Sequence, residues 1–319
     1  MIHRNFIEYY KYRRSSGKKG WPLVRILVHD ILAEFIGSFF EILCRINVFT
    51  PKIFVQMDGG ICSQMHQYLV GQIYAEQGLD VRYDLSFFRI NGMDVDGKFP
   101  RFFEIEDMFP NLHVKTAGKV AMWFYRFFLR FSSYRHELPK KAGSELAPIY
   151  LGSYYILDDE LFKNLFDKHF RQTKLADIKS HPTIDNHTGC HKCAVHVRRG
   201  DLARGDNPWY GGVTDDYFFR AIEYVSKRHS EVTFYFFSDE MDYVETNLLH
   251  KLDVEYELVK GPHKAYEDLI LISKCDTIIA SQGSFGKFAA MLNEKSLLIL
   301  QDDCYATPWL ARKPKAIAI

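Results

Sequence analysis

The sequence lacks several features that would assign a function at once. Its net charge is close to zero, because 41 Lys and Arg are balanced by 40 Asp and Glu in 319 residues. A dedicated nucleic-acid-binding protein is normally basic overall, so that class is disfavoured. The six cysteines are scattered, unlike the disulfide framework of a small secreted domain. Neither a Walker-type P-loop nor a G-x-G-x-x-G turn opening a helix occurs, which excludes the commonest phosphate and dinucleotide loops.

One cysteine pair invites a metal or redox interpretation. Cys190 and Cys193 form a C-x-x-C with His187 and His191 beside them. A structural zinc site needs four ligands, usually from two such pairs, and no second pair exists. A redox pair belongs at a helix N-terminus after a strand, whereas this one leads into a predicted strand. We therefore interpret the two residues as reduced cysteines at the entrance of a strand.

The abundant residues are aromatic, at 15% with 26 Phe and 19 Tyr. They gather with Lys and Arg in two segments, 23–49 and 115–141, and a basic stretch at 1–20 precedes the first. That stretch lacks the apolar core and cleavage site of a signal peptide. Charged residues interrupt 23–49, so we expect no spanning helix there. Both segments are compatible with amphipathic helices lying on an anionic membrane, and equally with helices packed in their own domain.

The remaining chain has the pattern of an α/β protein. A strand at 54–57, the turn Gly59-Gly60, a helix at 64–77 and a strand at 81–84 form a βαβ unit. Further on, short strands alternate with helices, which predicts a parallel sheet covered on both faces. The predicted strands are 193–197, 232–237, 254–258, 277–280 and 297–300, and the helices are 214–229, 242–249, 266–273 and 284–292.

We divide the chain into three parts. Residues 1–50 form a basic, amphipathic helical extension, and 51–180 form an N-terminal lobe with a helical basic–aromatic insertion. Residues 181–319 form a C-terminal lobe, and the polar stretch 173–189 is the predicted linker.

Polar and cationic residues follow three predicted strands of the C-terminal lobe. In open parallel sheets, ligands bind outside the carboxyl ends of the strands. The residues there are His196, Arg198, Arg199, Gly200, Asp201, Ser238, Asp239, Ser281, Ser284 and Phe285. Arginine forks and a helix N-terminus both bind phosphate oxygens, so the sequence predicts a diphosphate site. Alternatively, one arginine points into solvent or pairs with Asp201, and Ser281 and Asp239 are helix N-caps.

The motifs resemble those of the α1,2-fucosyltransferases, glycosyltransferase family 11. The segment 196–201, His-Val-Arg-Arg-Gly-Asp, is similar to the family motif H-x-R-R-G-D, and 234–239 to its strand ending in Phe-Ser-Asp. Segments 267–293 and 59–68 resemble its third motif and its G-G-L-G-N-Q-M-F-Q-Y turn. The sequence departs from the family at Cys62 and Ser63, and at 283–288, where two tryptophans are lost.

The resemblance implies a GT-B-type fold, with two Rossmann-like lobes facing a cleft, and an inverting α1,2-fucosyltransferase. The donor would be GDP-fucose and the acceptor a galactoside of a cell-surface glycan precursor, free or lipid-linked. The resemblance also implies that no cofactor or metal ion is required, and the sequence is compatible with this, since Asp94-Val-Asp96 lies in an irregular segment rather than after a strand. The expected location is cytoplasmic, including the inner face of the membrane. Another nucleotide sugar, or nucleotide-sugar or glycan binding without catalysis, remain alternatives.

Family position makes Arg199 the first choice for stabilising the leaving diphosphate, with Arg198 beside it. The nucleotide sugar would contact His196, Gly200, Ser238, Asp239, Ser281, Ser284 and Phe285, with His196 and Asp201 fixing the arginine geometry. The acceptor side would be the turn with Gly59, Gly60, Gln64 and His66. The general base is left open among Asp58, His66 and Asp201.

Overall fold

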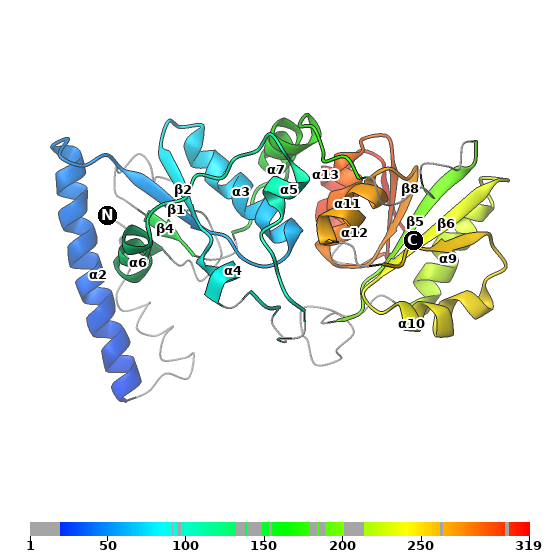
Figure 1. The fold of residues 1–319 in the computed structure, drawn as a ribbon, viewed down its shortest axis with the longest axis horizontal. Coiled ribbons are helices and arrows are strands. Elements are labelled where there is room, and N and C mark those ends of the chain that lie inside the picture. Colours follow the sequence, from blue (N-terminus) through cyan, green and yellow to red (C-terminus); the bar gives the residue numbers. More distant parts are fainter. Residues whose placement is uncertain are drawn as a thin grey trace. The chain divides into compact units, whose positions relative to one another are not determined.

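Figure 1 shows the computed structural model, which describes twelve parts of the chain. They are residues 20–90, 92–94, 97, 99–131, 138, 149–152, 155–178, 184, 189–200, 214–261, 264–303 and 306–319. These residues divide into two compact units. The first comprises Met1–Asp58, Ser63–Gly92 and Val114–Leu157, and the second comprises Gly59–Cys62, Met93–His113 and Asp158–Ile319.

The first unit is built on a parallel four-stranded sheet with the order β2-β1-β4-β3. Its strands are β1 (Lys52–Gln56), β2 (Asp80–Asp84), β3 (Arg130–Phe131) and β4 (Ile149–Leu151). Helix α3 (Ile61–Ala75) connects β1 to β2, so the predicted βαβ unit is confirmed. Gly71 of α3 lies against β2, because a Cβ there would be 2.2 Å from the hydroxyl oxygen of Tyr83.

Two helices of the first unit carry the basic–aromatic segments. Helix α2 (Trp21–Arg45) packs along α6 (Lys119–Phe128), where Phe40 contacts Phe124 with ring centroids 5.5 Å apart (Figure 1). The helix in the segment 115–141 is shorter than predicted. It ends at Phe128, and Arg130 pairs with Tyr150 in the sheet. None of the helices in the described part of the chain combines the length and apolar character needed to cross a bilayer.

Short helices follow β2 in the chain. Helix α4 (Ser86–Ile90) belongs to the first unit and α5 (Ile105–Met108) to the second. Helix α5 lies within 88–111, which the sequence indicated as irregular, and α4 begins two residues before that segment.

The second unit contains a parallel six-stranded sheet with the order β10-β9-β8-β5-β6-β7. The strands are β5 (His191–Val197), β6 (Val232–Ser238), β7 (Tyr256–Leu258), β8 (Thr277–Ala280), β9 (Leu297–Leu300) and β10 (Ala316–Ala318). Counted from β5, the order is that of a doubly wound dinucleotide-binding fold. The four central strands, β9, β8, β5 and β6, are mostly buried because helices cover both faces, with α9 on one side and α11 and α12 on the other (Figure 1). The edge strands β7 and β10 are partly exposed. The predicted α/β class is confirmed for both units, while the cleft between the lobes stays a prediction.

The four helical regions predicted for this sheet lie close to their predicted ranges, whereas the last helix and strand β10 were not predicted. The helices are α9 (Asp215–Ser226), α10 (Met241–Tyr243), the π-helix η3 (Val244–Leu248), the 3₁₀ turn η4 (Leu249–Lys251), α11 (Ala265–Ser273), α12 (Ser284–Leu292) and α13 (Thr307–Arg312). Thr214 caps α9, its hydroxyl oxygen accepting from the amide of Tyr217 at 3.2 Å. Cys190 and Cys193 are free at the entrance of β5, as the sequence indicated.

The second unit begins earlier than the predicted boundary at 180/181. Helix α7 (Asp159–Phe166) and the π-helix η1 (Asp167–Arg171) belong to it. Phe162 and Phe166 lie 5.8 and 5.6 Å from the ring of Phe288 on α12, and Phe162 also contacts Trp309. This aromatic packing joins residues 158–171 to the C-terminal sheet, although they precede the polar stretch in the sequence.

Candidate active site

The candidate site lies at the carboxyl ends of β5 and β8, where the strand order of the second sheet reverses. The side-chain oxygen of Ser281, after β8, donates to the carbonyl of His196 at 2.6 Å and accepts from the amide of Arg198 at 2.8 Å. Ser281 therefore joins the two strand ends. It is not the N-cap of α12, a position that Gly283 occupies. A reversal of strand order is where doubly wound sheets bind their ligands.

Asp239, at the end of β6, organises both arginines. One carboxylate oxygen lies 2.8 Å from Nη1 of Arg198, and the other accepts from the backbone amide of Arg199 at 2.9 Å. The neighbouring Ser238 donates to the carbonyl of Val197 at 2.8 Å and accepts from the amide of Glu240. Asp239 does not cap the helix that follows, because Glu240 is the N-cap of α10. The carboxylate is a positioning group for the segment after β5.

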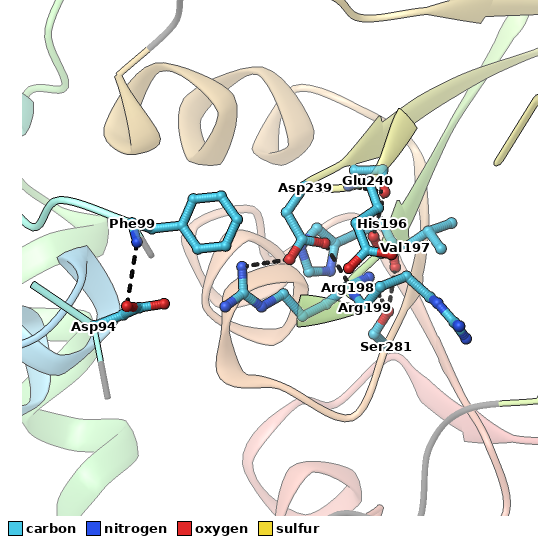
Figure 2. A network of polar contacts seen from close by, with 10 residues as sticks. Asp94, Phe99, His196, Val197, Arg198, Arg199, Asp239, Glu240 and Ser281 are labelled. Carbon is cyan, nitrogen blue, oxygen red and sulfur yellow. Dashed lines mark hydrogen bonds and ion pairs between the residues drawn. The ribbon is translucent and has the colours of Figure 1, made fainter. Parts of the chain in front are cut away.

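The side chains of the two arginines diverge. Figure 2 shows Arg198 reaching Asp239, while Arg199 leaves the strand end in another direction. The guanidinium of Arg199 lies over the ring of Tyr243, 3.7 Å from its centroid, and the Tyr243 hydroxyl donates to Asp215 at 2.5 Å. A cation on an aromatic face is stabilised by the ring quadrupole. Arg198 is thus the arginine whose charge lies beside Asp239 and whose backbone amide is bound to Ser281 at the strand ends.

Two glycines at the site allow close packing that a Cβ atom would block. At Gly200, where φ is +23°, a Cβ would lie 2.6 Å from Oδ2 of Asp239 and 3.3 Å from the Arg198 guanidinium. At Gly286 in α12, a Cβ would lie 2.8 Å from the Cβ of Ala280 and 3.5 Å from that of His196. The absence of a side chain at Gly286 lets α12 pack directly on the ends of β8 and β5.

His196 is buried between the sheet and α12. Its ring stacks on Phe285 with centroids 5.1 Å apart. Burial, assisted by the charge of Arg198, lowers the pKa of His196 to about 3, so the imidazole is neutral at pH 7. Its Nδ1 is buried and has no hydrogen-bond partner among the described residues. His196 therefore acts as a packing and positioning residue rather than as a cation in the site.

The turn that opens α12 is held by a buried lysine. Lys287 is 2% exposed, and its ammonium donates to the carbonyl of Gln282 at 2.6 Å. Burial lowers the pKa of Lys287 to about 8. Ser284, the first residue of α12, is exposed and also hydrogen-bonds the buried thiol of Cys62, whose pKa burial raises to about 12. Cys62 is therefore a protonated packing residue and not a nucleophile.

The glycine turn before α3 presents a carboxylate held by amides. Asp58 accepts from the side-chain amides of Gln56 at 2.8 Å and Gln67 at 2.6 Å, and its own amide donates to Gln67 at 2.8 Å. Nε2 of His66 lies 2.7 Å from the carbonyl oxygen of Tyr155, and Gln64 is fully buried. The carboxylate is oriented by two glutamines, while His66 and Gln64 are engaged in packing the first unit.

Gly59 and Gly60 belong to the second unit, and a Cβ on Gly60 would lie 3.6 Å from Nη1 of Arg101. Asp94 accepts from the amide of Phe99 at 3.2 Å in a turn of the same unit, drawn in Figure 2. Asp201 lies outside the described residues. The sequence interpretation missed Tyr243, Asp215 and Arg101 as site residues, since no local pattern relates them to the strand ends. Gln67 and Lys287, by contrast, lay within quoted motif segments but were not selected.

Comparison with known proteins agrees with these motifs. Residues 153–318, about half of the chain, match the family described as Glycosyl transferase family 11. The chain belongs to this family.

Curated relatives of this family 11 chain include an α-1,2-colitosyltransferase of Escherichia coli. It is 24% identical over 285 residues, which cover 82% of this chain and 93% of the relative. A galactoside 2-α-L-fucosyltransferase of Bos taurus, SEC1, is 31% identical over 110 residues, covering 33% of this chain and 30% of the relative. The O-antigen biosynthesis glycosyltransferase WbnK of Escherichia coli is 27% identical over 104 residues, which cover 31% of this chain and 34% of the relative.

Solved structures match this chain at lower sequence identity than these relatives do. A NodZ α-1,6-fucosyltransferase soaked with GDP-fucose matches with a TM-score of 0.44 and 16% identity, covering 80% of this chain and 96% of that one. The Escherichia coli ADP-heptose lipopolysaccharide heptosyltransferase II matches with a TM-score of 0.45 and 12% identity, covering 84% and 90%.

Proposed function

We propose that this family 11 glycosyltransferase moves L-fucose from GDP-fucose to the 2-hydroxyl of a galactoside, with inversion and without a metal ion. The acceptor is the precursor of a cell-surface glycan, and the reaction takes place on the cytoplasmic side. Family membership, the relatives named for 2-α-L-fucosyl transfer and O-antigen synthesis, and the strand-end constellation support this proposal.

The observation that carries the proposal is the fixed position of Arg198. Its guanidinium lies 2.8 Å from Asp239, and its amide is bound to Ser281 at 2.8 Å, where the strand order reverses. A donor that loses a nucleoside diphosphate develops negative charge on the leaving phosphates. Preorganised cations and N–H groups stabilise that charge without reorganisation during the reaction. Arg198 and the N-terminus of α12, where Ser284 is exposed, supply such groups here, and Arg199 is the second cation of the site.

Asp58 remains our candidate for the group that accepts the proton of the acceptor hydroxyl. Its carboxylate is oriented by the side-chain amides of Gln56 and Gln67. Such positioned bases contribute about 10²–10⁴-fold to proton-transfer steps. We predict that Asp58→Asn lowers kcat by that factor and leaves the Kd for GDP unchanged. If kcat is unchanged, Asp58 is not the base, and either Asp201 is the base or the reaction needs none.

The two arginines are tested by matched substitutions. Arg198→Ala should lower kcat/KM about 10²–10³-fold, as expected for removal of one preorganised donor, and should weaken GDP binding measured by calorimetry. Arg199→Ala should abolish turnover, because it removes the cation that family position makes the first choice for the leaving diphosphate and uncovers Tyr243. Arg220→Ala, an exposed arginine of α9 paired with Asp216, is the control and should be neutral. Full activity in both site variants would overturn the mechanism.

A second candidate function is α-1,2-colitosyl transfer, because the colitosyltransferase is similar over most of this chain. Colitose is fucose without its 3-hydroxyl. A site that hydrogen-bonds a hydroxyl rejects the analogue lacking it by about 10⁴–10⁵-fold, whereas an apolar pocket rejects a hydroxyl only weakly. Competition between GDP-fucose and GDP-colitose on one β-galactoside acceptor separates the two donors. If the protein prefers GDP-colitose as donor, the proposal of fucosyl transfer is wrong and colitosyl transfer takes its place.

The same assay separates catalysis from binding alone. A protein that binds GDP but gives neither transfer nor donor hydrolysis with any nucleotide sugar would be a binding protein on a transferase fold. Nucleotide sugars with other bases should produce neither binding nor product.

A further inference from the structure

The helix pair α2–α6 of the first unit carries an exposed apolar surface that the proposed catalysis does not use. On α2, the side chains of Trp21, Val28, Ile31, Phe35, Phe39 and Ile42 are each 52–77% exposed. We call these six residues the apolar stripe. With 3.6 residues per turn they fall within an arc of about 80° on one face of the helix. A monomeric soluble protein rarely exposes so long a run of large apolar side chains.

The opposite face of α2 is already occupied. Ile36 and Phe40 pack against the cluster formed by α6 and β1, and Nε2 of His29 donates to the carbonyl of Phe127 at 2.6 Å. The stripe is therefore not a core face left open by a helix that could simply rotate. It is a second apolar face, exposed while the first face packs on α6 and β1.

The α6 helix extends this surface with aromatic residues. Trp123 and Phe127 are 54% and 46% exposed, and their rings stack with centroids 5.4 Å apart and an angle of 11°. The edge of Phe127 also contacts the ring of His29 on α2. Indole and phenyl rings of this kind are favoured at the boundary between lipid headgroups and acyl chains.

Cations border the apolar stripe on both sides. Arg25 and Arg45 each lie about 40° beyond one edge of the stripe. Arg25 is exposed, and the side chain of Arg45 is 66% exposed although it pairs with Glu41, which is buried. On α6, Lys119 is exposed next to Trp123. Long cationic side chains beside an apolar face can reach phosphate headgroups while the face enters the acyl region.

Lys and Arg are unevenly distributed along the sequence. Residues 1–20 and 115–141 contain 13 Lys and Arg and two Glu, whereas the remaining chain has 28 Lys and Arg against 38 Asp and Glu. Helix α2 itself also carries Asp30, Glu34 and Glu41. Along the sequence, the cationic excess of a chain with a net charge of +1 thus lies in residues 1–20, which precede α2, and in 115–141, which include α6.

We propose that the apolar stripe and the Trp123–Phe127 surface bind an anionic lipid bilayer, with α2 lying in the headgroup plane. A second copy of the chain fits less well, because the exposed cations Arg25, Arg45 and Lys119 match anionic headgroups, whereas another copy of this surface would bring like charges. This inference goes beyond the proposed catalysis and does not depend on it.

The test is flotation of the full chain with vesicles that contain neither nucleotide nor glycan. Vesicles of phosphatidylcholine mixed with phosphatidylglycerol should carry the protein, and vesicles of phosphatidylcholine alone should carry much less. The double variant Phe35→Ser/Phe39→Ser should reduce the partition at least about tenfold. Arg25→Gln and Lys119→Gln should each weaken it about fivefold, with the loss disappearing at high salt.

The matched control is Ile90→Ser, which changes a 77% exposed side chain of α4 in the same unit. It should bind vesicles like the parent, and circular dichroism should show all variants folded. No flotation with anionic vesicles overturns the proposal. So does light scattering that finds a dimer which Phe35→Ser/Phe39→Ser dissociates, because a second copy then covers the stripe. Equal binding to both vesicle types overturns the requirement for anionic lipid.

Discussion

Single atoms decide how closely α12 can approach the candidate site. At Gly286 an added Cβ would lie 2.8 Å from the Cβ of Ala280. Neither atom can rotate away, since each is attached directly to the backbone. We predict that Gly286→Ala lowers the free energy of unfolding by about 1–3 kcal/mol, as overpacking does, and weakens GDP binding because α12 shifts. Denaturant titration and calorimetry measure the two effects.

Gly118→Ala is the matched control for that substitution. Gly118 has φ of −62°, and a Cβ there would meet nothing within 4 Å. Its unfolding free energy should stay within about 0.5 kcal/mol of the parent. Equal stability of the two variants would show that α12 does not pack on β8 as closely as described.

A buried carboxyl in the second unit predicts a pH effect. Burial raises the pKa of Glu104 to about 7. Between the ordinary value of 4.5 and 7, the folded state binds more protons than the unfolded state, so this group makes stability fall as pH rises. Thermal unfolding of the parent and of Glu104→Gln from pH 4.5 to 8 should give curves whose difference changes across that window. The exposed Glu255→Gln should show no such change.

At the scale of elements, α7 illustrates how a local signal starts a helix. The carboxylate of Asp158 accepts from the amides of Glu160 at 3.0 Å and Leu161 at 3.2 Å. We predict that Asp158→Ala costs about 1 kcal/mol, because two amides of the first turn lose their partner. Asp158→Asn keeps an acceptor at the same place and should recover most of the loss. Thermal unfolding of the three proteins checks this order.

Elements whose burial is continuous were predicted well from the sequence. The strands 277–280 and 297–300 and the helix 284–292 have the predicted bounds, since runs of apolar residues between glycine and polar turns mark them. Strands β3 and β4 were missed. Each has two or three residues and exists because it pairs with distant ones, such as Ile149 with Ile53. A sequence window contains no trace of such a partner.

The site residues that follow a recognisable strand were likewise predicted from the sequence. Arg198, Asp239 and Ser281 were predicted because each directly follows a recognisable strand, and the structure brings these three together. The divergence of the two arginines was not predictable. It depends on Tyr243, which lies beyond the end of another strand and reaches Arg199 only through the tertiary fold.

For the whole molecule, ligand binding should be visible as stabilisation. A ligand that binds only the folded state at a hundred times its Kd stabilises that state by about 2.7 kcal/mol. We predict that GDP raises the thermal midpoint of the parent, and that UDP and ADP do not. In Arg198→Ala the shift should disappear although the unliganded midpoint is nearly unchanged. An equal shift with all three nucleotides would mean that recognition stops at the phosphates.

The path of the chain between its two units has a consequence for recombination and engineering. The chain passes from one unit to the other five times, since residues 59–62 and 93–113 belong with the C-terminal sheet although they interrupt the N-terminal part. A chimera of two relatives joined once near residue 158 would therefore inherit a second unit assembled from both parents. Exchange of donor preference between relatives should succeed only when those two short insertions, Cys62 and Arg101 included, travel with residues 158–319.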